Sequence, residues 1–212
     1  MSGDDRTDER RASFERQLER RDITDRRVLE AMYNVPRHAF VSADLAPFAY
    51  DDRPLPIGYD ATISQPYIVA LMAQVLRLQP TDRVLDVGAG SGYSAAVLAE
   101  LAGEVIAVEY VAPLAQLAAT RLAPYGDRVE VACADGSLGY TERAPYDAIN
   151  VAAAASDVPP PLLEQLADGG RLVMPVGRRT VQLILITRTG GRYEREMLIP
   201  VRFVRLLGRH SR

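Results

Sequence analysis

The stretch VLDVGAGSGY, Val84 to Tyr93, holds the residue types whose spacing is best suited to binding a ligand. Apolar residues and one acid, Asp86, precede three glycines spaced G-x-G-x-G. A strand that ends in glycines lets the main chain approach a ligand where a Cβ would collide, and the helix that follows points free N–H groups at the same place. The spacing therefore predicts a ligand-binding loop, although the same glycines could serve only as a tight strand-to-helix turn in another α/β protein.

The residues around this loop distinguish between kinds of ligand. The dinucleotide fingerprint G-x-G-x-x-G requires a third glycine at position 93, where the chain has Tyr93. Asp86 stands before Gly88, where we expect it to face a cationic or hydroxylated group. Glu109 ends the next apolar strand, EVIAVE, at the spacing of an acceptor of ribose hydroxyls. S-adenosylmethionine combines an ammonium, a sulfonium and a ribose diol without a phosphate, so the two acids favour this cofactor over NAD.

Alternating strands and helices are expected to position the loop. Helical patterns, SAAVLAELA and PLAQLAATRLA, lie between apolar strands at Val84 to Val87, Val105 to Val108, Val129 to Cys133 and Ala148 to Val151. Strand, helix and strand at this spacing predict a parallel sheet with right-handed crossovers. The pattern PPLLEQLADGG predicts one more helix, closed by Gly169 and Gly170, before the strand RLVMPVG. Two last strands, joined at Gly190 and Gly191, predict an antiparallel hairpin.

The N-terminal part predicts a different organisation. Residues 1–12 are almost entirely polar and charged, which predicts a disordered tail, and residues 13–212 are expected to form a single domain. Within it, residues 13–64 should supply two short helices and a substrate loop, and residues 65–208 the Rossmann-like core. The proline-rich stretch from 35 to 64 shows no period and predicts an irregular connection. Ser64 then precedes the helical pattern QPYIVALMAQVLRL at the expected N-cap position.

Composition limits the partners and the compartment. With 212 residues, 48% of them hydrophobic, and a formal net charge of −3, the chain predicts one domain and no nucleic-acid or membrane partner held by bulk electrostatics. The single cysteine, Cys133, excludes an internal disulfide, and together with only two histidines it argues against a zinc site. There is no membrane-length apolar run, and the N-terminus does not resemble a signal peptide. We therefore expect a cytoplasmic monomer.

Nine motifs, in the same order, resemble the protein-L-isoaspartate O-methyltransferase family over most of the chain, from Phe14 to Gly208. They are FERQLERRDITDRRVLEAM, VPRHAFV, AYDDRPLPIG, TISQPYIVALM, VLDVGAGSGY, ADGSLGY, APYDAINVAAAA, LLEQLADGGRLVMPVG and PVRFV. Such a series is far more specific than one glycine loop. The resemblance implies a Rossmann-like methyltransferase fold that uses S-adenosylmethionine, with a mostly parallel central sheet, a C-terminal antiparallel hairpin and an N-terminal helical extension.

The resemblance also implies an activity and a set of site residues. Members of the family methylate the free α-carboxylate of L-isoaspartyl residues in damaged proteins and peptides, which starts repair through a succinimide. Carried over position by position, the cofactor-binding residues are Asp86, Gly88, Gly90, Glu109, Asp135 and Gly136, and the substrate-binding residues are Thr62, Ser64, Gln65 and Arg202. The serine of the TIS motif, Ser64, is the active residue by the same match.

This chemistry requires few catalytic groups. A peptide carboxylate, with a pKa of about 3.5 to 4, is already ionised at neutral pH, so no strong general base is needed. The Ser64 hydroxyl and the N–H groups at the start of the following helix could hold it, since a helix N-terminus favours anions. The alternative for Ser64 is plain N-capping, worth about 1 kcal/mol. Thr62 and Gln65 could equally be loop hydrogen-bonders, and Arg202 a solvated arginine on an edge strand.

The chain departs from the family pattern at three places, and these departures leave a second hypothesis open. Before TIS the family usually has glycine and glutamine where this chain has Asp60 and Ala61. Arg205 replaces the proline of VRFVPL, and Ser156 replaces a proline after the alanine run. The second hypothesis is a methyltransferase of the same family that acts on a normal aspartate of a dedicated biosynthetic peptide. A NAD-dependent oxidoreductase and a non-catalytic cofactor-binding module represent other classes of protein.

Overall fold

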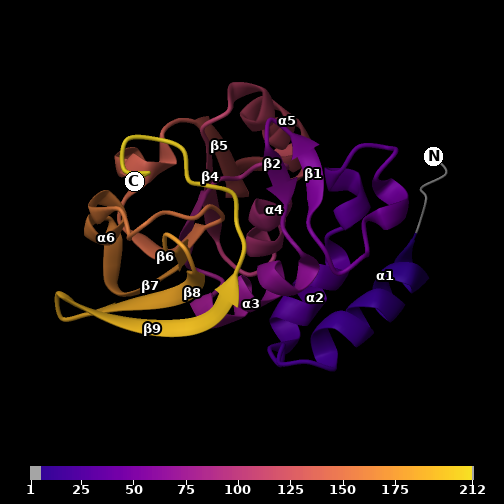
Figure 1. The fold of residues 1–212 in the computed structure, drawn as a ribbon, viewed down its shortest axis with the longest axis horizontal. Helices are drawn as coiled ribbons and strands as arrows, with labels where there is room; N and C mark the ends of the chain where they lie inside the picture. The colour runs from indigo at the N-terminus through magenta and orange to yellow at the C-terminus, as the bar shows by residue number, and fades with distance from the viewer. Residues whose placement is uncertain (1–5, 212) are drawn as a thin grey trace.

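The computed structural model describes residues 6–211, which form an α/β fold around a seven-stranded sheet (Figure 1). The strand order is β5-β4-β3-β6-β7-β8-β9. Strand pairs from β5 to β7 are parallel, and β7, β8 and β9 pair antiparallel. The strands of this sheet are β3 (Arg83–Val87), β4 (Glu104–Glu109), β5 (Val129–Cys133), β6 (Tyr146–Val151), β7 (Leu166–Val176), β8 (Val181–Thr189) and β9 (Arg192–Val201). The predicted fold class is therefore confirmed.

Side chains of the central strands alternate between two apolar cores, as the two-residue period of a strand requires. In β3, Val84 faces the core formed with the N-terminal helices, whereas Leu85 and Val87 face the opposite core. The helices of the first face are α1 (Thr7–Phe14), α2 (Arg26–Asn34), α3 (Pro66–Leu76), α4 (Tyr93–Ala99) and α5 (Ala112–Leu122). The opposite core includes Leu162 of α6 (Pro160–Glu164) and Leu206, which follows β9. No helix within residues 6–211 is long and apolar enough to cross a membrane.

The N-terminal helix begins earlier than the sequence predicts. Thr7–Phe14 forms α1, so the expectation of a disordered tail is wrong over residues 7–12. Residues 1–5 of the predicted tail lie outside the described part of the chain. The helix is tied to the domain at its end: Phe14 is fully buried, its ring packs edge-on against Tyr50, and the Ser13 hydroxyl donates to the Tyr50 carbonyl at 2.5 Å. A π-helical turn, η1 (Glu15–Glu19), then leads to α2.

The proline-rich stretch is more ordered than an irregular connection. It contains two 3-10 turns, η2 (Arg37–Phe40) and η3 (Ala46–Phe48), and an antiparallel hairpin of β1 (Leu55–Gly58) and β2 (Ala61–Ile63). Gly58, Tyr59 and Asp60 form the tip with φ values of 88°, 54° and 57°. Left-handed backbone at non-glycine residues is unfavourable, so sequence rules do not predict this turn.

The helix before β7 is shorter than predicted. It ends at Glu164, and Gly169 and Gly170 lie within β7 instead of closing the helix. The reason is tertiary: Leu166 is fully buried and pairs with Tyr146 of β6, so strand pairing begins immediately after α6. The expected C-terminal hairpin is present, with β8 and β9 joined at two glycines in left-handed conformation. The remaining short 3-10 turns are η4 (Ala123–Arg128), η5 (Gly136–Leu138) and η6 (Thr141–Arg143).

Candidate active site

The glycine loop leaves β3 at Val87 and crosses the carboxyl end of β4. The N–H groups of Gly88 and Ala89 both donate to the Val108 carbonyl, at 2.8 and 3.1 Å. Gly88 and Gly90 have φ values of 83° and 53°, which an L side chain rarely adopts. The loop is thus folded back over the sheet edge and presents its main chain to a cavity.

Glu109 holds this loop from the neighbouring strand. Its side chain is almost fully buried. One carboxylate oxygen accepts a hydrogen bond from the Gly90 N–H and the other from the Val111 N–H, both at 2.8 Å. Each carboxylate oxygen has a second lone pair, so Glu109 can still accept hydrogen bonds from a ligand. The structure therefore places Glu109 at the cavity wall, where it could accept the ribose hydroxyls that the sequence analysis assigns to it.

Asp86 does not line the cavity, contrary to the expectation that it faces the ligand directly. It is fully buried on the same face of β3 as Val84, beneath α4, where Oδ1 accepts from Asn150 Nδ2 at 2.7 Å and from the Ser94 hydroxyl at 3.4 Å. Oδ2 has no partner among the described residues. Burial raises the pKa of this carboxyl to about 6. The two-residue strand period explains the difference, because Val87, not Asp86, points to the opposite face.

Asp135 and Gly136 follow β5, and only the glycine lines the cavity. A Cβ on Gly136 would lie 2.6 Å from Val87 Cγ1, so only glycine fits there. The Asp135 carboxylate accepts from the main-chain N–H groups of Ser137, at 3.0 Å, and Arg209, at 2.8 Å. Burial acts to raise the pKa of Asp135, but the hydrogen bond from the Ser137 hydroxyl, at 2.6 Å, and those from the two main-chain N–H groups outweigh it, so the pKa lies below its ordinary value. Asp135 therefore anchors the C-terminal segment beside the cavity.

Ser64 is not the N-cap of α3, so the capping alternative is wrong. The helix begins at Pro66, and Gln65 occupies the N-cap position without a side-chain capping bond. Within residues 6–211, the Ser64 hydroxyl has no hydrogen-bond partner, whereas its carbonyl accepts from Arg37 at 3.0 Å. The hydroxyl is consequently available to a ligand.

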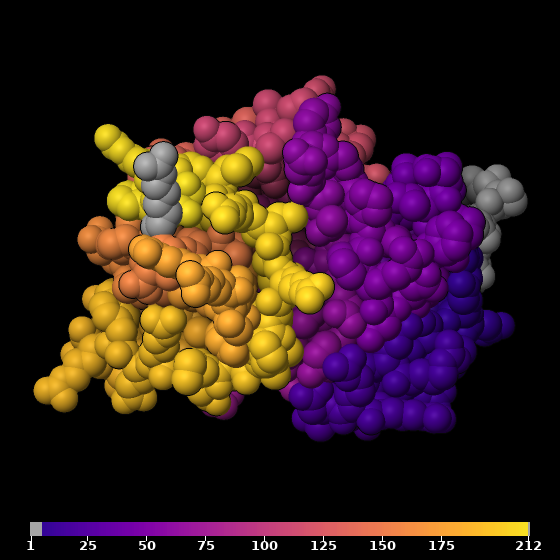
Figure 2. All heavy atoms as spheres, in the orientation of Figure 1, coloured from indigo at the N-terminus to yellow at the C-terminus, as the bar shows by residue number. Residues whose placement is uncertain are grey.

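Two cavities adjoin at this serine. The first, of about 300 Å³, lies between the glycine loop, the tip of the β1–β2 hairpin and residues 204–207. The second, of about 710 Å³, lies between the start of α3 and residues 200–204. Residues that line both cavities are Thr62, Ser64, Ala152 and Val204. In Figure 2 a hollow is visible where the yellow C-terminal segment meets the purple segment that contains this hairpin.

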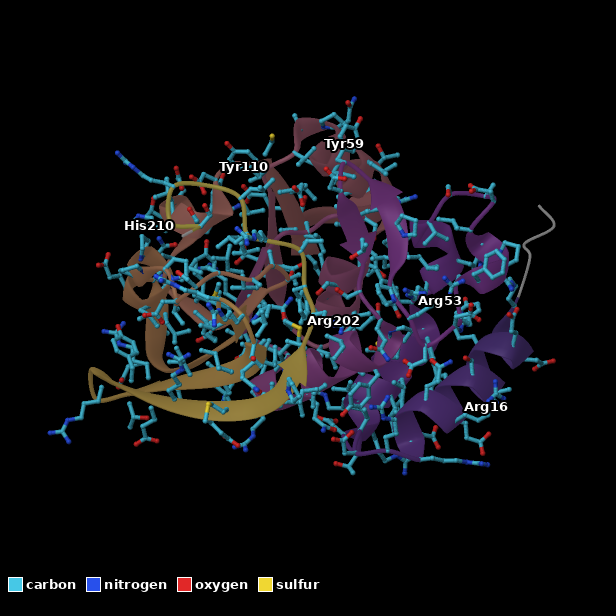
Figure 3. All side chains as sticks on the ribbon, viewed as in Figure 1. Arg16, Arg53, Tyr59, Tyr110, Arg202 and His210 are labelled. Carbon is cyan, nitrogen blue, oxygen red and sulfur yellow. The ribbon has the colours of Figure 1, made fainter. Side chains whose placement is uncertain are left out.

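The predicted substrate residues are divided between the cavities. Thr62 and Ser64 line both, and Gln65 and Arg202 line only the second. Arg202 is exposed near the middle of the face shown in Figure 3, with no partner among the described residues. The structure thus gathers all four residues, from segments far apart in the chain.

Several lining residues were not predicted from the sequence. Tyr59, Tyr110 and Leu207 are exposed apolar side chains around the first cavity, and both tyrosines lie along the same edge in Figure 3. Tyr110 directly follows the predicted ligand acid, which is a usable signal. Leu207 carries no such signal, because its place depends on a main-chain bridge: the N–H of Leu206 donates to the Ala154 carbonyl at 2.8 Å.

Comparison with known proteins identifies the family. Residues 9–211 match the family described as Protein-L-isoaspartate(D-aspartate) O-methyltransferase (PCMT). Over 202 residues the chain is 55% identical to the Protein-L-isoaspartate O-methyltransferase of Opitutus terrae, covering 94% of this chain and 87% of that one. Over 208 residues it is 52% identical to the protein of the same name from Methanoregula boonei, covering 97% and 96%.

Solved structures agree. A PCMT-type protein of Plasmodium falciparum, in complex with S-adenosyl-L-homocysteine, superposes with a TM-score of 0.84 at 29% identity, covering 93% of this chain and 98% of that one. The predicted resemblance is therefore confirmed across nearly the whole chain. The chain belongs to the protein-L-isoaspartate O-methyltransferase family.

Proposed function

We propose that this chain transfers a methyl group from S-adenosylmethionine to the free α-carboxylate of L-isoaspartyl residues in damaged proteins and peptides. The observation that carries the proposal is the pair of adjoining cavities that share Ser64. The first cavity, at the glycine loop, can bind the cofactor, and the second cavity can bind the peptide. Family membership and identities above 50% to relatives named for this activity support the assignment.

The residues of the first cavity fit S-adenosylmethionine. Glu109 can accept from a ribose diol, Gly88, Gly90 and Gly136 leave room for the cofactor, and Val87 and Val108 offer apolar surface. Asp86 has a buried carboxylate oxygen without a partner among the described residues, and we propose that it acts on the cofactor through Ser94, which it contacts and which lines the first cavity, rather than by direct contact. Asp135 supports the cofactor cavity by holding the C-terminal segment, whose residues 204–207 form part of the wall. The cofactor supplies a methyl group on a sulfonium, which passes to the carboxylate oxygen and leaves S-adenosylhomocysteine.

The chain's own task is to hold an acceptor that is already reactive. A peptide carboxylate is ionised at neutral pH, so the site needs to position it and exclude water rather than remove a proton. The Ser64 hydroxyl can donate to this carboxylate, and the N-terminal end of α3 favours an anion. Thr62 and Gln65 flank the same place, and Arg202 lies further along the second cavity. The methyl ester then cyclises to a succinimide, whose hydrolysis returns part of the material to normal aspartate.

The direct test uses a peptide pair that differs only in aspartate versus isoaspartate. Purified protein and radiolabelled S-adenosylmethionine should label the isoaspartyl peptide and leave its normal counterpart unlabelled. Equal labelling of the two peptides, or none of the isoaspartyl one, would contradict the proposal.

The second candidate is methylation of a normal aspartate in a dedicated biosynthetic peptide. It is motivated by Asp60 and Arg205, which both line the first cavity and are charged where the family pattern usually has uncharged residues. The same assay separates the two functions, because an enzyme specific for a normal aspartate of a dedicated peptide would not methylate generic isoaspartyl peptides. Neighbouring genes for a short precursor peptide would favour it.

We further propose that the enzyme acts as a cytoplasmic monomer in which residues 13–212 fold as one domain. Both cavities are lined by residues from the N-terminal part, such as Thr62 and Ser64, and from the core, such as Val204, which supports folding of the two parts as one unit. Phe14 and Leu18 of the N-terminal helices belong to the same core as Val84 of the central sheet. Light scattering after size exclusion should give the mass of one chain, and a dimer mass would contradict this.

A further inference from the structure

Arg37 is the largest fully buried charged side chain among the described residues, with 0% of its surface exposed. Its guanidinium donates to three main-chain carbonyls: those of Ala49, of Arg53 at 3.2 Å and of Ser64 at 3.0 Å. Within residues 6–211, no carboxylate forms an ion pair with it. Arg37 is therefore a buried cation whose hydrogen bonds all go to main-chain carbonyls, while Asp51 and Asp52 act on its charge only from a distance.

Such a side chain is costly to retain. A buried charge loses its hydration, and without an opposite charge in contact the loss is only partly offset. Burial accordingly lowers the pKa of Arg37, and its Nε has no hydrogen-bond partner in the described part of the chain. An apolar side chain of similar volume would avoid this cost, but it would leave the three carbonyls without their donor. The role of the arginine therefore lies in the segments that these carbonyls belong to.

The contacts of one nitrogen suggest what the arginine does. Nη2 donates both to Arg53, which precedes β1, and to Ser64, which follows β2. It therefore closes the base of the β1–β2 hairpin. This hairpin has only three paired positions, and a two-stranded hairpin of that size is marginal by itself.

The clamped hairpin supplies the acceptor side of the site. Its tip lines the first cavity, and Thr62 and Ser64 line both cavities. Arg37 also lies 5.9 Å from the ring centroid of Tyr93, the residue that starts α4 after the glycine loop. One buried side chain thus connects the segment that meets the acceptor with the segment that meets the cofactor.

We propose that Arg37 is a positioning residue for methyl transfer. It fixes the main chain at Ser64 from behind, so that the free hydroxyl faces the acceptor carboxylate. This inference rests on the proposed function and adds a residue that touches neither substrate nor cofactor.

Arg27 provides a matched control. Its guanidinium also bridges two main-chain carbonyls, those of Leu78 at 2.7 Å and Leu101 at 2.8 Å. Neither carbonyl belongs to a residue that lines the two cavities. Loss of Arg27 should therefore lower stability without a selective effect on the acceptor.

The test compares Arg37→Met, Arg37→Lys and Arg27→Met at a temperature where all are folded. We expect Arg37→Met to lower kcat/KM for an isoaspartyl peptide about tenfold or more, as a small misplacement in the site can. The affinity for S-adenosylhomocysteine, measured by calorimetry, should change less than about threefold, because most of that cavity is untouched. Arg37→Lys retains the positive charge but not the several N–H donors of the guanidinium, so its kcat/KM should lie between those of wild type and Arg37→Met. Arg27→Met should leave both quantities unchanged, and equal effects of the two Met variants would overturn the proposal.

Hydrogen exchange gives a readout that is independent of turnover. Arg37→Lys should speed amide exchange at residues 61–65 and leave α4 unchanged, and no difference from wild type at 61–65 would overturn the proposal even if Arg37→Met fails to fold. Wild-type turnover of the isoaspartyl peptide tests the proposed function separately. A protein that methylates no peptide but shows the exchange difference would refute the proposed function, and only the structural part of the inference, that Arg37 anchors residues 61–65, would stand.

Discussion

Ser64 shows how one residue of helix register decides a side chain's role. Serine before a helical pattern usually caps it, yet α3 begins at Pro66, and the cap position falls to Gln65. The freed hydroxyl stands between the two cavities. The Ser64 hydroxyl forms no hydrogen bond with any other described residue, so it is free to bind the acceptor.

Ser64→Ala should separate the two interpretations of this serine. Because no cap is lost, the free energy of unfolding should change by less than about 0.5 kcal/mol. Methylation should suffer: kcat/KM for an isoaspartyl peptide should fall about tenfold to a hundredfold, while S-adenosylhomocysteine binds as before. Thermal melts, steady-state kinetics and calorimetry measure the three quantities. A destabilised variant with unchanged kcat/KM would restore the capping interpretation.

Asp86 predicts a pH effect on stability. Burial raises the pKa of its carboxyl from an ordinary value of 3.8 to about 6 in the folded chain, so the folded state binds this proton more tightly than the unfolded state. By linkage, stability declines as pH rises from about 4 to about 6 and stays lower above that range. Asp86→Asn, which cannot ionise, should gain up to about 3 kcal/mol relative to wild type between pH 4 and pH 8.

Chemical denaturation of both proteins without cofactor, at several pH values between 4 and 8, measures this gain. The amide oxygen introduced by Asp86→Asn can keep accepting from Asn150, so the comparison changes charge more than packing. Parallel stability profiles would show that the carboxyl is ionised without penalty.

At the scale of elements, the segment after β9 completes the cofactor cavity. It crosses the carboxyl ends of the strands in Figure 1 and is fastened twice: the Arg209 N–H donates to Asp135 at 2.8 Å, and the His210 N–H donates to Ser137 at 3.0 Å. Gly208 makes this approach possible, because a Cβ there would lie 1.9 Å from Asp135 Oδ1. The cavity wall formed by residues 204–207 thus depends on contacts beyond it.

Gly208→Ala should weaken cofactor binding through this segment. The clash and the φ of 125° should displace the segment, and the Kd for S-adenosylhomocysteine should rise about fivefold or more, since such strain is of order 1–3 kcal/mol. Gly190→Ala is the control, because Gly190 also has a positive φ, 56°, with open space around it at the far hairpin turn. Calorimetry on both variants checks this, and equal Kd values would contradict it.

At the scale of the whole molecule, charge is distributed unevenly. The net charge of the chain is −3. Among the described residues that line the second cavity, the one charged side chain is nevertheless a cation, Arg202. A second arginine, Arg205, lines the adjoining first cavity. Both are exposed. A peptide that enters by this route therefore meets positive charge, which favours acidic residues next to the isoaspartate.

Arg202→Gln should reduce this preference. The measurement uses two isoaspartyl peptides that differ only in having Glu or Gln beside the isoaspartate. In Arg202→Gln, kcat/KM for the Glu peptide should fall about threefold to tenfold more than kcat/KM for the Gln peptide. In the wild-type enzyme, added salt should reduce the preference for the Glu peptide, as expected for an exposed charge. Arg192→Gln, at the opposite end of β9, is the matched control and should change neither peptide. Identical effects on the two peptides would assign Arg202 a packing role.

Much of the fold follows from the sequence alone, because its signals are local. The periods of apolar residues predicted the central strands, and the paired glycines at 190 and 191 predicted the last turn. The same local signals predicted Glu109 and the glycine loop as ligand-binding groups, and both line the first cavity, since both lie where buried strands end. It was wrong where distant contacts decide: α1 is held by Tyr50, and α6 is cut short by the pairing of Leu166 with Tyr146.

The site as a working unit depends on tertiary structure. The residue types predicted a cofactor and an acceptor loop, but not that Asp86 turns away from the cavity, that Asp135 fastens the C-terminal segment, or that Arg37 closes the hairpin beneath Ser64. These roles rest on contacts between residues far apart in the chain, and a single sequence contains no local pattern for them. The sequence determined which chemical groups are present, and only the packing of the chain decided which of them face the acceptor.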